Sequence, residues 1–189
     1  MRDLEIRGAG NILGAQQHGH MDKIGYELYS KLLREEISGE EEVMPELDIR
    51  VNAYIPDKYI ESNVSRMDAY KQIAEINSPQ LESEFIEYAE ETFGKLPLEV
   101  INLISIAVVK RLATKLGISK INVTKDDVSL IFSSFKAFSN KKLVETIESY
   151  DEKIIISMES QPKIKFVING NGNSAMLFSI RRFLTEATK

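Results

Sequence analysis

The opening stretch DLEIRGAGNILGAQQHGHM holds glycines in a spacing that could cradle a phosphate: Gly8, Gly10 and Gly14. Such a turn binds a dinucleotide when a buried strand precedes it, a helix opens at it, and an acidic residue follows about 20 positions on. Asp3 and Glu5 would put charges into that strand, and the first helical pattern begins only near Asp22. The stretch therefore does not predict a cofactor site, and no GxxxxGK[ST] motif occurs in the chain.

Metal and nucleophile chemistry have equally little support. His18 and His20 are the only histidines, and the chain has no cysteine. Two histidines at i and i+2 chelate a metal only from an extended segment, and both lie in one polar loop. Two histidines in the same loop do not by themselves indicate a Ser-His-Asp triad. We predict no catalytic residue, no metal site and no bound cofactor in this chain.

Charged clusters are the remaining candidates. Acidic runs such as EEISGEEEVMPELD and LESEFIEYAEETF are typical of solvated linkers and helix faces. The basic residues form two groups: Lys110, Arg111, Lys115, Lys120 and Lys125, then Arg181 and Arg182. Aromatic residues that would stack on bases are not interleaved with them. A solvated helix end is the main interpretation, and a nucleic-acid contact through Lys110, Arg111 and Lys115 is the alternative.

Composition describes a packed globular chain. Hydrophobic residues make up 43% and charged residues 28% of 189 residues, and the net charge is −5. That charge argues against broad attraction to nucleic acid. No apolar run approaches the roughly 18 to 20 residues of a membrane span, and MRDLEIRG lacks the apolar core of a signal peptide. Together with the lack of cysteine, these features predict a cytoplasmic protein without membrane contact.

The elements that would position these residues fall into three parts. Residues 1–21 are predicted as a glycine-rich loop, and a helix from Asp22 to about Ile37 leads into an acidic linker broken by Gly39 and Pro45. We place boundaries at 1–21, 22–44 and 45–189. Residues 47–55 alternate apolar and polar side chains, which predicts a half-buried strand ended by Pro56.

Helices and short strands follow in turn. A helical tract runs to Phe93, interrupted where Ser78 caps a helix with Pro79 at its first position, and it stops at Gly94. The apolar segment from Pro97 to Gly117 predicts the central buried helix.

The last third alternates between strands and helices. ISKINV and DVSLIF predict a hairpin, and Phe138–Tyr150 a helix capped by Ser139 or Asn140. IIISM and KIKFVI predict two more strands, and Ser174 is expected to cap a final helix to about Glu186. The predicted fold is α+β, a small mixed or antiparallel sheet with surrounding helices, preceded by the loop and the first helix.

The opening segment RDLEIRGAGNILGAQQHGHMDKIGYELYSKLL resembles the segment that follows the last helicase motif in bacterial transcription-repair coupling factors, the Mfd family. A shorter relative of this motif follows the motor of the RecG helicase. MPELDIRVNAYIPDKYI, RMDAYKQIAEI, ETFGKLP and KRLATKLGISKI then follow the order of the family's C-terminal domain. The resemblance covers essentially the whole chain.

The resemblance implies that residues 1–21 are the end of a translocation motif, which links ATP hydrolysis to movement on duplex DNA. It assigns the coupling to Arg7 and Gln17, and it implies that ATP and Mg bind in the rest of the parent protein. Arginine offers a fixed fork of donors and glutamine both a donor and an acceptor, which suits that role. Glycines at positions 8, 10 and 14 would let the backbone turn tightly against a partner surface.

For residues 45–189 the resemblance implies a regulatory, autoinhibitory domain. It would pack on an N-terminal module similar to UvrB and mask the surface that recruits UvrA; RNA polymerase would bind another domain. Glu87 and Glu91 are the implied contact positions. Relatives read DRFG where this chain reads ETFG, so the charge at Glu91 is kept and the arginine is absent. The expected function is that of a non-catalytic part of a DNA translocase, with a direct duplex-DNA-binding module as the alternative.

Overall fold

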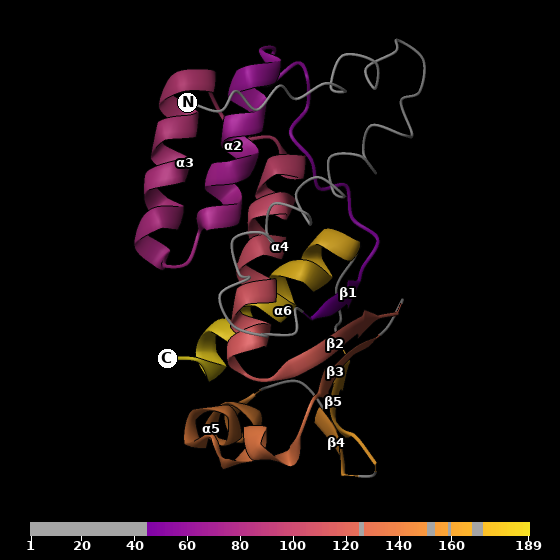
Figure 1. Ribbon diagram of the computed structural model, residues 1–189. Helices are drawn as coiled ribbons and strands as arrows, with labels where there is room; N and C mark the ends of the chain where they lie inside the picture. The colour runs from indigo at the N-terminus through magenta and orange to yellow at the C-terminus, as the bar shows by residue number, and fades with distance from the viewer. Residues whose placement is uncertain (1–44, 125–126, 151–153, 159, 168–171) are drawn as a thin grey trace, which may run out of the picture.

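The computed structural model describes residues 45–124, 127–150, 154–158, 160–167 and 172–189. The predicted loop 1–21 and connecting segment 22–44 lie outside these residues and stay predictions. Within the described residues the chain forms five α-helices, a short 3-10 helix and five strands. The α+β class with a small mixed sheet is therefore confirmed (Figure 1).

The sheet has the strand order β1-β2-β3-β5-β4. Its strands are β1 (Glu46–Asp48), β2 (Ile118–Val123), β3 (Asp127–Phe132), β4 (Ile154–Met158) and β5 (Pro162–Val167). β1 runs parallel to β2, and all other neighbours are antiparallel. The predicted hairpin of β2 and β3 is confirmed, with Val123 opposite Val128.

One face of the sheet forms part of the hydrophobic core. Ile121, Leu130 and Ile164 are neighbours across β2, β3 and β5, and each is 0% exposed. Because side chains alternate along a strand, the residues directly before and after each of these three point to the opposite face of the sheet. Helix α6 (Asn173–Ala187) packs onto this core through Phe183, whose ring stacks on Phe166 at a centroid distance of 5.3 Å. Helix α5 (Lys141–Ser149) contacts α6.

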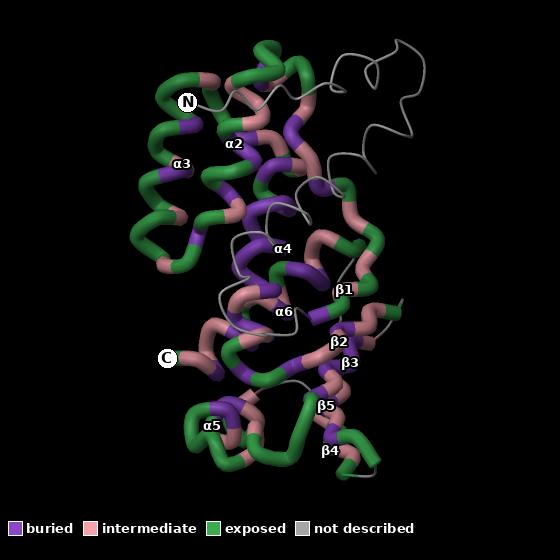
Figure 2. The backbone as a smooth tube through the Cα atoms, in the orientation of Figure 1, coloured by how far each residue is buried: buried purple, intermediate pink, exposed green. Residues whose placement is uncertain are grey.

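Three helices build the other end of the molecule: α2 (Asn63–Glu75), α3 (Pro79–Phe93) and α4 (Leu98–Lys115). α4 is the predicted central helix and is buried along most of its length, as Figure 2 shows. It contacts α2 toward one end of the molecule and α6 and β2 toward the other (Figure 1). The stop at Gly117 is confirmed, because its φ of +69° lies in the left-handed region that favours glycine.

Three sequence-based expectations need correction. The predicted strand 47–55 pairs with β2 only as β1, up to Asp48. Beyond β1, the carbonyls of Arg50 and Asn52 accept hydrogen bonds from the side-chain amides of Asn173 and Asn102 and not from a neighbouring strand. The alternation of buried and exposed side chains nevertheless continues after β1, where Ala53 and Ile55 are buried.

The second correction concerns the helix predicted from Phe138. Residues 135–139 form a 3-10 helix, so α5 starts at Lys141 and is capped by Asn140 and not by Ser139.

The third correction concerns Ser174, which does not cap α6. The N-cap position is Gly172, which has no side chain to bond the first turn. The Ser174 hydroxyl instead accepts a hydrogen bond of 3.2 Å from the side-chain amide of Asn102 on α4. Ser174 therefore ties the start of α6 to the central helix.

Candidate interaction surfaces

The predicted site residues fall into two groups. The coupling residues of the glycine-rich loop lie outside the described residues: Arg7, Gly8, Gly10, Gly14 and Gln17. The acidic and basic candidates of residues 45–189 lie within them, apart from Lys125.

Helix α3 presents an acidic outer face. Ser78 accepts from the backbone N–H of Leu81 at 3.3 Å, and Pro79 occupies the first helical position, as predicted. From this start, the 3.6-residue period brings Glu84, Glu87 and Glu91 to one side of the helix. All three are exposed. Tyr88 lies among them with 46% of its surface exposed. The predicted contact residues Glu87 and Glu91 are therefore accessible on one surface.

The inner face of α3 holds little buried surface. Phe85 and Ala89 are buried, and Ile86 and, at the C-terminal end, Phe93 are partly buried. There Tyr59 donates its hydroxyl to the carbonyl oxygens of Ala89 at 3.2 Å and Gly94 at 3.0 Å. Burial first, and then the nearby Glu90 carboxylate, raise the pKa of the Tyr59 phenol. Tyr59 stays protonated at neutral pH and anchors this end of α3.

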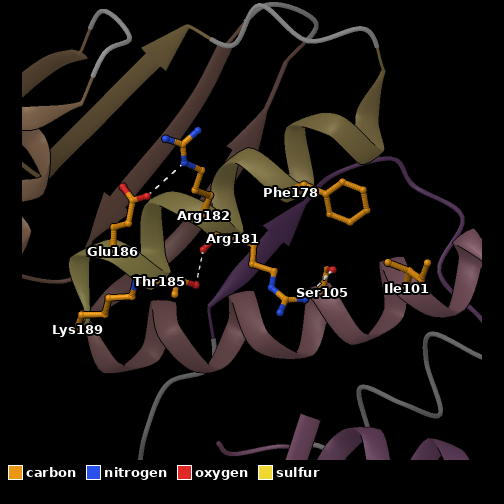
Figure 3. Close-up of a pocket in the computed structure, with 8 residues that line it drawn as sticks. All are labelled: Ile101, Ser105, Phe178, Arg181, Arg182, Thr185, Glu186 and Lys189. Atoms are coloured by element: carbon orange, nitrogen blue, oxygen red, sulfur yellow. Dashed lines mark hydrogen bonds and ion pairs between the residues drawn. The ribbon is translucent and has the colours of Figure 1, made fainter. Parts of the chain in front are cut away.

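An ion-pair cluster lies at the other end of α3. Glu82, in the first turn, pairs with the guanidinium of Arg181 from α6. Arg181 also donates to the hydroxyl of Ser105 on α4 at 3.3 Å (Figure 3). Arg111 of α4 donates to the backbone carbonyl of Asn77, just before α3. Three helices therefore meet at these side chains, which we call the α3 clasp: Glu82, Arg111 and Arg181.

The α3 clasp is partly shielded from water. The side chain of Glu82 is 13% exposed and that of Arg181 29%. Burial lowers the pKa of the Arg111 guanidinium; the Glu82 carboxylate opposes this shift, and Arg181 adds to it. One carboxylate thus faces two guanidinium groups at a site where charges are screened less than at the surface.

An open groove of about 520 Å³ lies beside the α3 clasp between α4 and α6. Its walls combine apolar and cationic side chains: Ile101, Ser105, Phe178, Arg181, Arg182, Thr185, Glu186 and Lys189. Arg181 points toward α4, whereas Arg182 points away and pairs with Glu186 at 3.2 Å (Figure 3). Sequence reasoning grouped the two arginines as one basic cluster, and the structure separates their roles.

The predicted basic cluster does not form one open surface. Lys110 is only 7% exposed, so the expectation of a solvated helix end is wrong for it. Arg111 belongs to the α3 clasp, and Lys120 pairs with Glu46 at 3.0 Å. Lys115 is exposed in the last turn of α4. The structure therefore does not bring Lys110, Arg111 and Lys115 together on one exposed face.

The described residues contain neither a candidate metal cluster nor a candidate membrane span. Among the residues that the structure describes, no group of three or more His, Cys, Asp or Glu side chains could hold a metal ion. His18 and His20 lie outside them. No described helix combines the length and the apolar composition that a bilayer crossing requires.

Known proteins share this architecture. A crystal structure of the C-terminal domain of transcription-repair coupling factor matches with a TM-score of 0.67, covering 77% of this chain and 92% of that chain. Its sequence identity of 19% makes this a likeness of fold. By its fold, the described chain is an α+β domain of that type.

Sequence comparisons define the family. A model of the TRCF domain matches residues 49–143, which run from the segment after β1 into α5. The chain is 36% identical over 184 residues to the transcription-repair-coupling factor of Bacillus subtilis (strain 168), covering 93% of this chain and 16% of the relative. It is 34% identical over 190 residues to that of Staphylococcus aureus (strain NCTC 8325 / PS 47), covering 96% and 15%.

The chain belongs to the TRCF domain family and corresponds to the C-terminal region of a transcription-repair coupling factor. It spans only a small part of these relatives, 16% of the first and 15% of the second.

Proposed function

We propose that this chain is the C-terminal regulatory part of an ATP-driven DNA translocase that displaces stalled RNA polymerase and recruits excision repair. Membership of the TRCF domain family supports this proposal. ATP and Mg would act in the motor of the parent protein. Residues 45–189 would serve as an interaction domain, and residues 1–21 as the motor-coupling hook with Arg7 and Gln17 as its coupling residues.

The observation that carries the regulatory role is the acidic outer face of α3. Glu87 and Glu91 lie one turn apart and are exposed. They occupy the positions where the family resemblance puts the autoinhibitory contact. We propose that this face docks on the UvrB-like N-terminal module of the parent protein and masks its UvrA-binding surface. The ring of Tyr88 would add apolar contact area between the carboxylates.

The test is a titration of this chain against that N-terminal module at physiological salt. We expect saturable binding that weakens as salt rises, because the contact uses exposed charges. The double variant Glu87→Lys/Glu91→Lys should raise the Kd by about tenfold or more, since it reverses the charge at two positions of the proposed interface. Failure of the unmodified chain to bind would contradict the autoinhibitory role.

A matched control separates position from net charge. Glu75→Lys/Glu148→Lys makes the same change of charge at exposed sites in the last turns of α2 and α5. This control should bind the module as the unmodified chain does. Duplex DNA is titrated in parallel: tight, salt-sensitive binding to DNA without binding to the module would favour the alternative function.

A further inference from the structure

Helix α3 buries much less of its surface than the central helix α4 does. Of its 15 residues, Phe85 and Ala89 are buried, and Ile86 and Phe93 are partly buried. The neighbouring 18-residue α4 buries side chains along most of its length. Because an element with few buried apolar contacts opens more easily than the core, the position of α3 depends on polar contacts at its ends.

The two ends of α3 are held by different residues. Tyr59 holds the C-terminal end through two hydrogen bonds. At the N-terminal end, Glu82 lies on the same inward stripe as Phe85 and Ala89, which turns its carboxylate toward α4 and α6. There it meets Arg181, which is fixed in turn by Ser105. Glu82 and Arg181 are 99 residues apart in sequence, so this contact joins α3 to the last helix.

We propose that Arg181 is a positioning residue that sets how α3 presents its acidic outer face. Its planar guanidinium holds two partners through different nitrogens, Glu82 through Nη2 and Ser105 through Nη1, in a fixed geometry. Glu82 and Arg181 are both partly shielded from water, so their attraction is screened less than that of a surface pair. The consequence for docking rests on the function proposed above; the consequence for α3 itself does not.

The test compares two neighbouring arginines of α6. Arg181→Gln removes the charge that faces Glu82, whereas Arg182→Gln removes a neighbouring charge that pairs along α6 with Glu186. Backbone amide exchange is measured in this 189-residue chain. We expect Arg181→Gln to speed exchange in α3 by about tenfold, because a charged hydrogen bond is lost there. Exchange in β3 and β5 should not change, and Arg182→Gln should leave α3 as it was.

A conservative variant and a binding measurement complete the test. Arg181→Lys keeps the charge and should restore part of the protection of α3. Arg181→Gln should also weaken binding to the N-terminal module several-fold, although Glu87 and Glu91 are intact.

Three results would overturn the inference. The first is unchanged exchange of α3 in Arg181→Gln, and the second is an equal acceleration in all elements, which would mean a general loss of stability. The third is a loosened α3 with unchanged affinity for the module. If the unmodified chain does not bind the module, the proposed function fails, and the exchange of α3 alone decides whether Arg181 positions it.

Discussion

Tyr59 shows how a single side chain can fix the end of a helix. Its ring packs edge-on against Phe93 at a centroid distance of 6.0 Å. Its hydroxyl donates to the backbone carbonyls of Ala89, in the last turns of α3, and of Gly94, just after the helix. Tyr59 precedes α2 in the sequence, so these contacts join the segment before α2 to the C-terminal end of α3.

Replacing Tyr59 by phenylalanine tests these hydrogen bonds. Tyr59→Phe keeps the ring contact and should lower the free energy of unfolding by about 1 kcal/mol at neutral pH. The pKa of the Tyr59 phenol is raised in the folded state. The free energy that Tyr59 contributes to folding is therefore fully present below the unfolded-state pKa of about 10. It is lost as the pH rises through the folded-state pKa. Urea titrations from neutral pH to about pH 11 should show the difference between the two proteins shrink. A difference independent of pH would contradict this assignment.

At the residue scale, the sequence predicts surface positions better than tertiary contacts. Helical periodicity alone separates Glu87 and Glu91 from the inward residues Phe85 and Ala89. It does not indicate that Arg181 pairs with Glu82, because no local pattern records a contact between residues so far apart. Likewise, the burial of Lys110 depends on the elements that surround α4, and a charged residue near a helix end is ordinarily solvated.

At the scale of elements, the boundaries set by backbone chemistry were predictable. Ser78, Pro79 and Gly117 fix helix ends through local hydrogen bonding or backbone angles, and the structure confirms each. The extent of β1 was not predictable, because the backbone beyond it bonds to side chains of α4 and α6, and no local pattern indicates these contacts. A strand requires a neighbour, whereas a helix satisfies its own backbone. This difference explains why the predicted strand 47–55 was too long, whereas the ends of α3 and α4 were predicted correctly.

The cap of α5 provides a prediction at this scale. The side-chain oxygen of Asn140 accepts from the backbone N–H of Lys142 at 3.0 Å and of Leu143 at 3.3 Å. Asn140→Ala should therefore cost about 1 kcal/mol of stability. Ser139→Ala, one residue earlier and exposed, is the matched control and should change stability by less than about 0.5 kcal/mol. Chemical denaturation of both variants distinguishes the two caps, and a larger loss for Ser139→Ala would contradict the structure.

At the scale of the whole molecule, α4 joins the helical end to the sheet end. Ile73 of α2 and Phe183 of α6 belong to one continuous hydrophobic core and are both 0% exposed. α4 contacts both of their helices. An element shared in this way couples the two ends, because neither can lose its packing without exposing apolar residues of α4. The described part of the chain is therefore expected to unfold as one cooperative unit, while α3 opens locally.

Large-to-small substitutions at the two ends test this coupling. Ile73→Ala should lower the free energy of unfolding by about 2 to 5 kcal/mol and Phe183→Ala by about 3 to 5 kcal/mol, because each leaves a cavity in the core. In both variants helix content and tyrosine signals should be lost in the same single transition. Val64→Ala on α2 is the control: Val64 is 72% exposed, so its replacement should cost less than about 0.5 kcal/mol. Tyr150 reports on the sheet end, because it packs on Phe183 at a centroid distance of 5.1 Å. If Ile73→Ala unfolded α2 and α3 first and left the signal of Tyr150 unchanged, the two ends would be independent units. In that case α4 would not couple them.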